Sequence, residues 1–162
     1  MPDAIEHVKL SDAAKYLLEE CRMVLPGIQA LFGFQLVAVY DDRFTELSGL
    51  DQALHFAAVG CTAISVALIM TPAAYHRSIG VQVVSEQFIR NSTRLLLASM
   101  PPLGLAISMD FYLVGRLVFD AAWPAAAGAV LFALFVFMWV AFPRSKALQR
   151  LLDRLPGERK SP

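Results

Sequence analysis

The sequence predicts an all-α, multi-pass membrane protein with four transmembrane helices packed as an antiparallel bundle. The chain is 57% hydrophobic and only 17% charged, whereas soluble domains are about 45–50% apolar and about 25% charged. The charged residues are also clustered, which leaves four long stretches almost free of Asp, Glu, Lys and Arg. The formal net charge of zero argues against a nucleic-acid partner, because such a partner requires a basic surface.

The four apolar stretches are long enough to cross a bilayer as helices. They cover residues 23–40, 52–75, 95–119 and 121–143, and only the third contains charged residues, Asp110 and Arg116. A helix rises about 1.5 Å per residue, so about 20 residues cross a hydrocarbon core of roughly 30 Å. The alternative is a soluble four-helix bundle, which would carry charged residues along the outer face of each helix. Because the fourth stretch is apolar on every side, we interpret residues 1–162 as one membrane domain.

Residues 1–22 precede the first span and carry eight charged residues but no secretory signal peptide. Leu10, Ala14, Leu17, Leu18 and Cys21 share one helical face, which predicts a short amphipathic helix at the cytoplasmic surface. The alternative is that this segment continues directly into the first span. A bend or a helix start is expected at Pro26 and Gly27.

The remaining connections differ in length. Residues 76–94 form a longer connection in which Val83, Val84, Phe88 and Ile89 are expected to face lipid. The connection between the third and fourth spans is tight and predicts a helical hairpin. The basic tail, residues 144–162, predicts a short interfacial helix through its leucines, Leu148, Leu151, Leu152 and Leu155.

Inside the third span, Pro101 and Pro102 are expected either to kink the helix or to set its start.

Basic residues indicate the orientation of the chain. Twelve of the fourteen fall on one side of the predicted membrane: Lys9, Lys15, Arg22, Arg77, Arg90, Arg94, Arg144, Lys146, Arg150, Arg154, Arg159 and Lys160. Because cytoplasmic segments carry the excess of Lys and Arg, both termini are expected in the cytoplasm. The predicted localisation is therefore the inner cell membrane, with the lipid bilayer as the principal surroundings.

Asp110 is the main candidate for an intramembrane polar site, together with His55 and Arg116. A carboxylate within a span costs about 2.5–3.5 kcal/mol on insertion scales, so it is usually paired or functional. We expect Asp110 to face the bundle interior and to meet His55, Arg116 or Arg43. Three roles stay open: a structural hydrogen-bonded pair, a proton or cation site, and a shallow, water-exposed carboxylate.

Two amides in the first span, Gln29 and Gln35, are six residues apart and therefore point about 120° away from each other. One of them can face partner helices while the other lies nearer to lipid or to a second subunit.

No motif indicates an enzyme. The chain contains no HExxH, Walker loop, GxSxG or CxxC, and His7, His55 and His76 lack the spacing of metal ligands. Cys21 and Cys61 are predicted at different depths, which argues against a disulfide. We therefore expect no catalytic residue, no metal and no cofactor.

The first half of the chain resembles an uncharacterised bacterial family of small four-span membrane proteins. The matching pattern is ExR, GxQxLFxF, RF and PxAYHR, which falls here on Glu20, Arg22, Gly27, Gln29, Leu31, Phe32, Phe34, Arg43, Phe44, Pro72, Ala74, Tyr75, His76 and Arg77. The resemblance implies a four-span topology and no activity. Most of the motif residues gather toward the cytoplasmic ends of the first two spans, so a second candidate site is a polar cluster of Glu20, Arg22, Gln29, His76 and Arg77.

Two functions follow as hypotheses. The first is an integral membrane protein that acts without catalysis, as an accessory or structural protein, in a homo-oligomer or with another membrane protein. The alternative is a small proton- or cation-coupled transporter that uses Asp110.

Overall fold

The structure, a computed structural model, describes residues 10–79, 85–119 and 121–145, and within these ranges it contains helices and turns but no strand. Helix α1 (Leu10–Ala38) is joined through a 3-10 helix, η1 (Asp42–Glu46), to α2 (Gly49–Ile79). Helix α3 (Glu86–Val118) follows, and the last helix consists of α4 (Trp123–Val136), a π-helical segment η2 (Phe137–Ala141) and α5 (Phe142–Arg144). Four helices are long and apolar enough to cross a membrane, which confirms the four predicted apolar helices.

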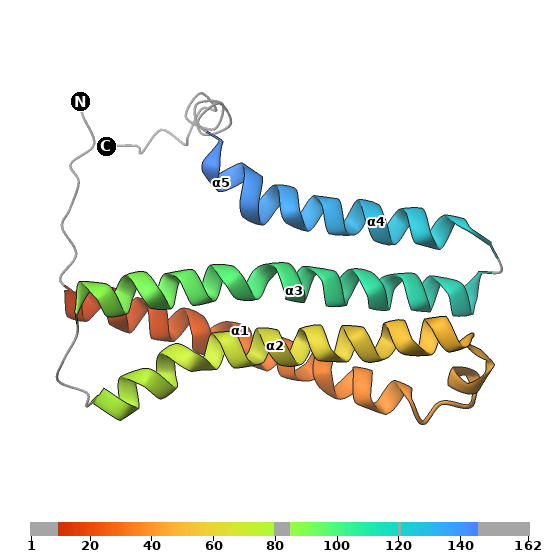
Figure 1. The fold of residues 1–162 in the computed structure, drawn as a ribbon, viewed down its shortest axis with the longest axis horizontal. Helices are drawn as coiled ribbons and strands as arrows, with labels where there is room; N and C mark the ends of the chain where they lie inside the picture. The colour runs from red at the N-terminus through yellow and green to blue at the C-terminus, as the bar shows by residue number, and fades with distance from the viewer. Residues whose placement is uncertain (1–9, 80–84, 120, 146–162) are drawn as a thin grey trace, which may run out of the picture.

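Three of the described helices, α1, α2 and α3, pack against one another, and the last helix lies on one side of this group. Helices α2 and α3 share the most extensive contact, and α1 packs against both of them (Figure 1). Helix α4 packs on α3 and makes no comparable contact with α1 or α2. The α1–α2 and α3–α4 connections lie at the same end of the molecule (Figure 1). The arrangement is thus more open than the four-helix bundle predicted from the sequence.

The buried face of α2 is made mostly of small and polar residues. Its buried positions recur at alternating spacings of four and three residues: Asp51, His55, Ala58, Thr62, Ser65, Ile69 and Pro72. This 3.5-residue repeat is the pattern of helices that pack side by side along their length. Large apolar side chains such as Phe56, Ile64 and Met70 are exposed instead. Soluble helices show the reverse distribution, and small or polar contacts between helices with an apolar outer face are typical of membrane proteins.

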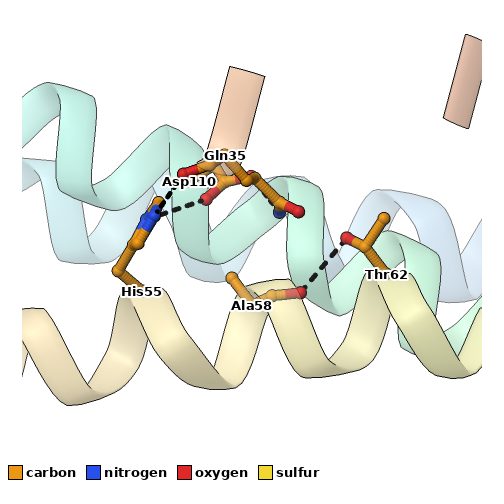
Figure 2. Close-up of polar contacts among 5 residues, drawn as sticks. All are labelled: Gln35, His55, Ala58, Thr62 and Asp110. Atoms are coloured by element: carbon orange, nitrogen blue, oxygen red, sulfur yellow. Dashed lines mark hydrogen bonds and ion pairs between the residues drawn. The ribbon is translucent and has the colours of Figure 1, made fainter. Parts of the chain in front are cut away.

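Hydroxyl groups along this face are satisfied inside the protein. Thr62 Oγ1 donates to the backbone oxygen of Ala58 at 3.1 Å, which is shown in Figure 2. Ser65 Oγ lies 2.9 Å from the backbone oxygen of Cys61 and 3.1 Å from that of Ser99 on α3. The Ser65 hydroxyl therefore links α2 to α3, and no buried hydroxyl of this face depends on water.

Helix α1 is one continuous helix, so the separate interfacial helix predicted for the N-terminal segment is wrong. Pro26 removes one backbone donor, yet the helix runs through it. The reason is a single packing face that extends across the proline: Leu17, Cys21 and Ile28 all belong to one buried cluster with Ile69 of α2. The alternative prediction, direct continuation into the first span, describes the structure.

The second connection is shorter than predicted because α3 begins at Glu86. Ser85 caps it, with its Oγ accepting from the backbone N–H of Phe88 at 3.1 Å. Phe88 was expected to face lipid, but it is buried and its ring stacks on Tyr75 with centroids 5.8 Å apart. The additional helical turns of α3 bring this ring against the end of α2. Ile89 is partly buried, while Val83, Val84 and the predicted tail helix lie outside the described residues.

Prolines do not end the later helices. Helix α3 continues through Pro101 and Pro102 and starts well before them, so the prolines do not set its start. In the last helix, Phe142 donates its backbone N–H to Phe137 O, five residues back. Pro143 follows and lacks an N–H for the α-helical pattern, which accounts for a π turn at this point.

Glycines allow α3 and α4 to approach each other closely. A Cβ added at Gly115 would lie 2.7 Å from Cβ of Pro124. A Cβ at Gly128 would lie 3.1 Å from the backbone oxygen of Ser108. Both positions require a residue without a side chain, since rigid atoms occupy the adjacent space.

We predict that Gly115→Ala destabilises the protein by about 1–3 kcal/mol, because the added methyl must displace the Pro124 ring. The measurement is the thermal unfolding midpoint of the purified protein in detergent. Gly60→Ala is the control, because no atom lies within 4 Å of a Cβ added there. Equal unfolding midpoints for the two variants would contradict the close α3–α4 contact.

Candidate functional site

Side chains from three helices converge on Asp110. Gln35 of α1 donates from Nε2 to Asp110 Oδ2 at 2.7 Å. His55 of α2 places Nε2 2.8 Å from the backbone oxygen of Gln35 and Nδ1 3.8 Å from Asp110 Oδ1. Figure 2 shows the three groups meeting between the helices. We call Gln35, His55 and Asp110 the polar triad, and each of its members contacts the other two.

The helical repeat explains why the triad forms. Cys21, Ile28 and Gln35 are seven residues apart and buried on the same face of α1. His55 belongs to the buried face of α2, and Asp110 lies between Ala106 and Leu113, which are buried positions of α3. Residues at equivalent positions of a 3.5-residue repeat point into the same contact. The triad is therefore a layer of amide and ionisable groups in a helix contact that otherwise consists of small, hydroxyl-bearing and apolar side chains.

The triad is largely shielded. The side chains of His55 and Asp110 are 8% and 20% exposed, and Gln35 is buried. Phe44 of η1 packs edge-on against the His55 ring, with centroids 5.3 Å apart. Within the part of the chain that the structure describes, Gln35 Oε1 has no hydrogen-bond partner. Shielding of this kind strengthens the electrostatic interactions between the three groups.

A cavity of about 440 Å³ reaches the triad. Its walls come from α1 and α3 and are apolar, with Leu31, Phe34, Leu113, Val114 and Leu117 among them. Gln35, His55 and Asp110 provide polar surface, and Asp41 and Arg43 line the part formed by the loop before α2. The volume is well above what one water molecule needs. Asp110 is thus partly open to a space that could admit water or a small ligand.

A second buried carboxylate, Asp51, lies one turn before His55 on α2. Ser48 Oγ accepts from the Asp51 backbone N–H at 3.2 Å and donates to Asp51 Oδ2 at 2.8 Å. Tyr112 of α3 donates from its hydroxyl to Asp51 Oδ1 at 3.0 Å. The S-x-x-D spacing identifies such a helix cap, but the contact with Tyr112 has no local sequence signal.

The structure brings together two of the three residues of the predicted intramembrane site. Asp110 pairs with His55, whereas Arg116 is exposed and forms no ion pair within the described ranges. Arg43 lines the cavity, and its hydrogen bond is from its backbone N–H to Asp41. Gln35 was not identified as a partner of Asp110. The sequence predicts that Gln29 and Gln35 point about 120° away from each other. In the structure Gln35 is buried and Gln29 is exposed.

The side chains of the predicted cytoplasmic-side cluster make no hydrogen bond or ion pair with one another in the described part of the chain. Glu20, Arg22, Gln29 and Arg77 are exposed. His76 is partly buried against the Phe88 ring, with centroids 5.6 Å apart. The placement of these side chains leaves them available to groups outside the chain.

A metal centre has no support in the described ranges, where no group of three or more His, Cys, Asp and Glu residues could hold a metal ion.

We predict that Gln35→Leu destabilises the protein by about 1–3 kcal/mol, because Asp110 Oδ2 loses its donor in a shielded site. Gln29→Leu is the matched control, the same change on an exposed position of the same helix, and is expected to shift stability by less than about 0.5 kcal/mol. Thermal unfolding in detergent measures both. A Gln35→Leu variant as stable as Gln29→Leu would show that the hydrogen bond to Asp110 contributes little.

Comparison with known proteins gives a match to a protein family. No curated protein and no solved structure matches the chain. The match is to a family model described as a family of unknown function, and it covers residues 6–143. This range includes the polar triad, the first three long helices and all of the fourth except Arg144. The chain therefore belongs to the family of unknown function DUF6328.

Proposed function

We propose that the chain is an integral inner-membrane protein that acts without catalysing a reaction, as an accessory or structural protein for other membrane proteins or for further copies of itself. The observation that carries the proposal is the inverted polarity of the helices. Small and polar residues fill the contact between α2 and α3, and large apolar side chains cover the outside. A bilayer is the environment in which this distribution is stable.

The charges at the two ends of the helices support an antiparallel four-span arrangement with both termini in the cytoplasm. Exposed arginines gather at the end where α3 begins and α2 and the last helix end: Arg77, Arg90, Arg94 and Arg144. Arg22 is exposed further along α1. Exposed acidic residues, Asp41, Asp42 and Glu46, lie at the other end. The positive-inside rule places the arginine-rich end in the cytoplasm.

Helix α4 supports an accessory role because it is the least covered of the four long helices. In the last helix, Trp123–Arg144, 6% of the residues in the most apolar 18-residue stretch are buried, compared with 17–28% in the other three. Ala125, Ala129 and Ala133 are exposed on it. Small side chains permit close approach of another helix in a membrane, so α4 is the surface we assign to contact with a partner helix.

We predict that a photo-crosslinking residue at Ala133 gives a discrete crosslinked product in native membranes. The same residue at Ile64, which is 55% exposed on α2, is the control for contact with lipid alone. A product with the mass of two chains indicates a homo-oligomer, and another discrete mass indicates a different membrane protein. Absence of any product at Ala133, or equal products at both positions, would contradict a partner on α4.

A proton- or cation-coupled transporter is the second candidate, and the polar triad is the observation that favours it. Asp110 is a carboxylate within a candidate membrane helix, paired with His55 and exposed to a cavity. Ionisable groups in such positions commonly belong to ion or proton pathways.

The transporter hypothesis predicts that reconstituted protein dissipates a pH gradient across liposomes faster than empty liposomes do. Asp110→Asn should reduce the rate to that of empty liposomes, since the amide, unlike the carboxyl group, cannot bind and release a proton. Asp42→Asn is the control, because Asp42 is exposed at the same end of the molecule. A wild-type rate equal to that of empty liposomes would reject transport and leave the accessory role.

A further inference from the structure

We infer that His55 and Asp110 together bind one exchangeable proton, which enters and leaves through the cavity between α1 and α3. This inference deepens the second candidate function by naming its ligand. It concerns binding alone, so it holds even if the protein transports nothing.

The contacts of the His55 ring show which of its nitrogens carries a hydrogen. Nε2 lies 2.8 Å from the backbone oxygen of Gln35. A backbone carbonyl only accepts hydrogen bonds, so Nε2 carries a hydrogen and donates. In a neutral imidazole only one nitrogen carries hydrogen. The other nitrogen, Nδ1, then presents a lone pair, and it is the atom that faces Asp110 Oδ1.

The contacts of Asp110 disfavour its ionised form beside a neutral His55. Its Oδ2 accepts from Gln35 Nε2, which leaves Oδ1 directed toward His55. An ionised Asp110 beside a neutral His55 would place two acceptors opposite each other with no donor between them. In a shielded environment such an arrangement is strongly unfavourable.

One added proton resolves the contact in either of two ways. Bound to Nδ1, it gives an imidazolium next to a carboxylate. Bound to Oδ1, it gives a carboxylic acid whose O–H can donate to Nδ1. The pair is neutral overall in both forms and carries one negative charge without the proton. A net charge within a membrane span is costly, so occupancy by one proton stabilises the folded protein.

Among the described residues, no cation other than His55 forms an ion pair with Asp110. On α1, Gln35 faces the pair, and residues 23–38 contain no charged side chain. Asp41 and Arg43 line the cavity but are exposed. Asp51 is engaged by Ser48 and Tyr112, as described above. Arg116 on α3 is exposed, and within the described ranges His55 is the only ion-pair partner of Asp110.

The cavity provides the route for exchange. Asp110 is 20% exposed and lines the cavity together with Asp41 and Arg43. The separation of 3.8 Å between Nδ1 and Oδ1 exceeds a hydrogen-bond distance of about 2.7–3.2 Å. Direct sharing of the proton therefore needs a small side-chain movement or one bridging water, which the cavity has room to supply.

Nitrogen-15 NMR of labelled histidine, with infrared spectroscopy of the carboxyl band, tests the inference on the full chain in lipid nanodiscs. His55 is assigned by the loss of its signal in His55→Gln. We expect one transition of one proton, in which the His55 Nδ1 signal and the Asp110 carboxyl band change at the same pH. In Asp110→Asn the His55 Nδ1 signal should change at a different pH from the wild type, because the charge partner of His55 is lost. In Asp42→Asn it should change at the wild-type pH.

Two results would overturn the inference. One is a wild-type His55 with an unprotonated Nδ1 beside an ionised Asp110 from about pH 5 to pH 9. The other is a His55 transition that is unchanged in Asp110→Asn. If Asp110→Asn does not fold, His55→Gln replaces it, and an Asp110 carboxyl band whose pH dependence equals that of the wild type then counts against a shared proton. A positive NMR result with no flux in liposomes rejects the transporter and retains the proton site.

Discussion

The fold depends on one constraint: polar groups in the contact between α2 and α3 must find their partners within the protein. The outer surface of these helices is apolar, so in the proposed bilayer it offers no water to satisfy a hydroxyl, an amide or a carboxylate. Ser65 illustrates the solution, since its hydroxyl lies within hydrogen-bond distance of backbone oxygens on two helices. Small residues between the polar ones allow the backbones to approach closely enough for such contacts.

The polar triad is the most demanding case of this constraint. Its groups are ionisable or strongly polar, and the three helices supply donors and acceptors for most of them. The remaining imbalance is one proton between His55 and Asp110, together with the unpaired Oε1 of Gln35. A helix contact in which two facing groups lack one proton between them is suited to respond to pH. The same geometry also serves the simpler role of fixing α1, α2 and α3 in register.

Much of this architecture could be predicted from the sequence because charge clustering is a strong signal. The four apolar helices were accessible in that way, and so was Asp110 as a group that meets His55, Arg116 or Arg43. The partner Gln35 was not, because a contact between α1 and α3 depends on helix register, which no local pattern of charges specifies. The continuity of α1 was only the alternative prediction, and the burial of Phe88 was missed. In both cases tertiary packing outweighed a local signal, a proline in the first and an amphipathic pattern in the second.

We propose that hydrocarbon surrounds the outer face of these helices. The most direct test places nitroxide spin labels at Phe56, Ile64 and Met70, which are exposed on α2, with Asp42 as a position in water. We expect the labels on α2 to collide often with oxygen and rarely with a water-soluble nickel complex, and the label at Asp42 to show the reverse. Equal access of the nickel complex to all four positions would contradict a membrane-embedded α2.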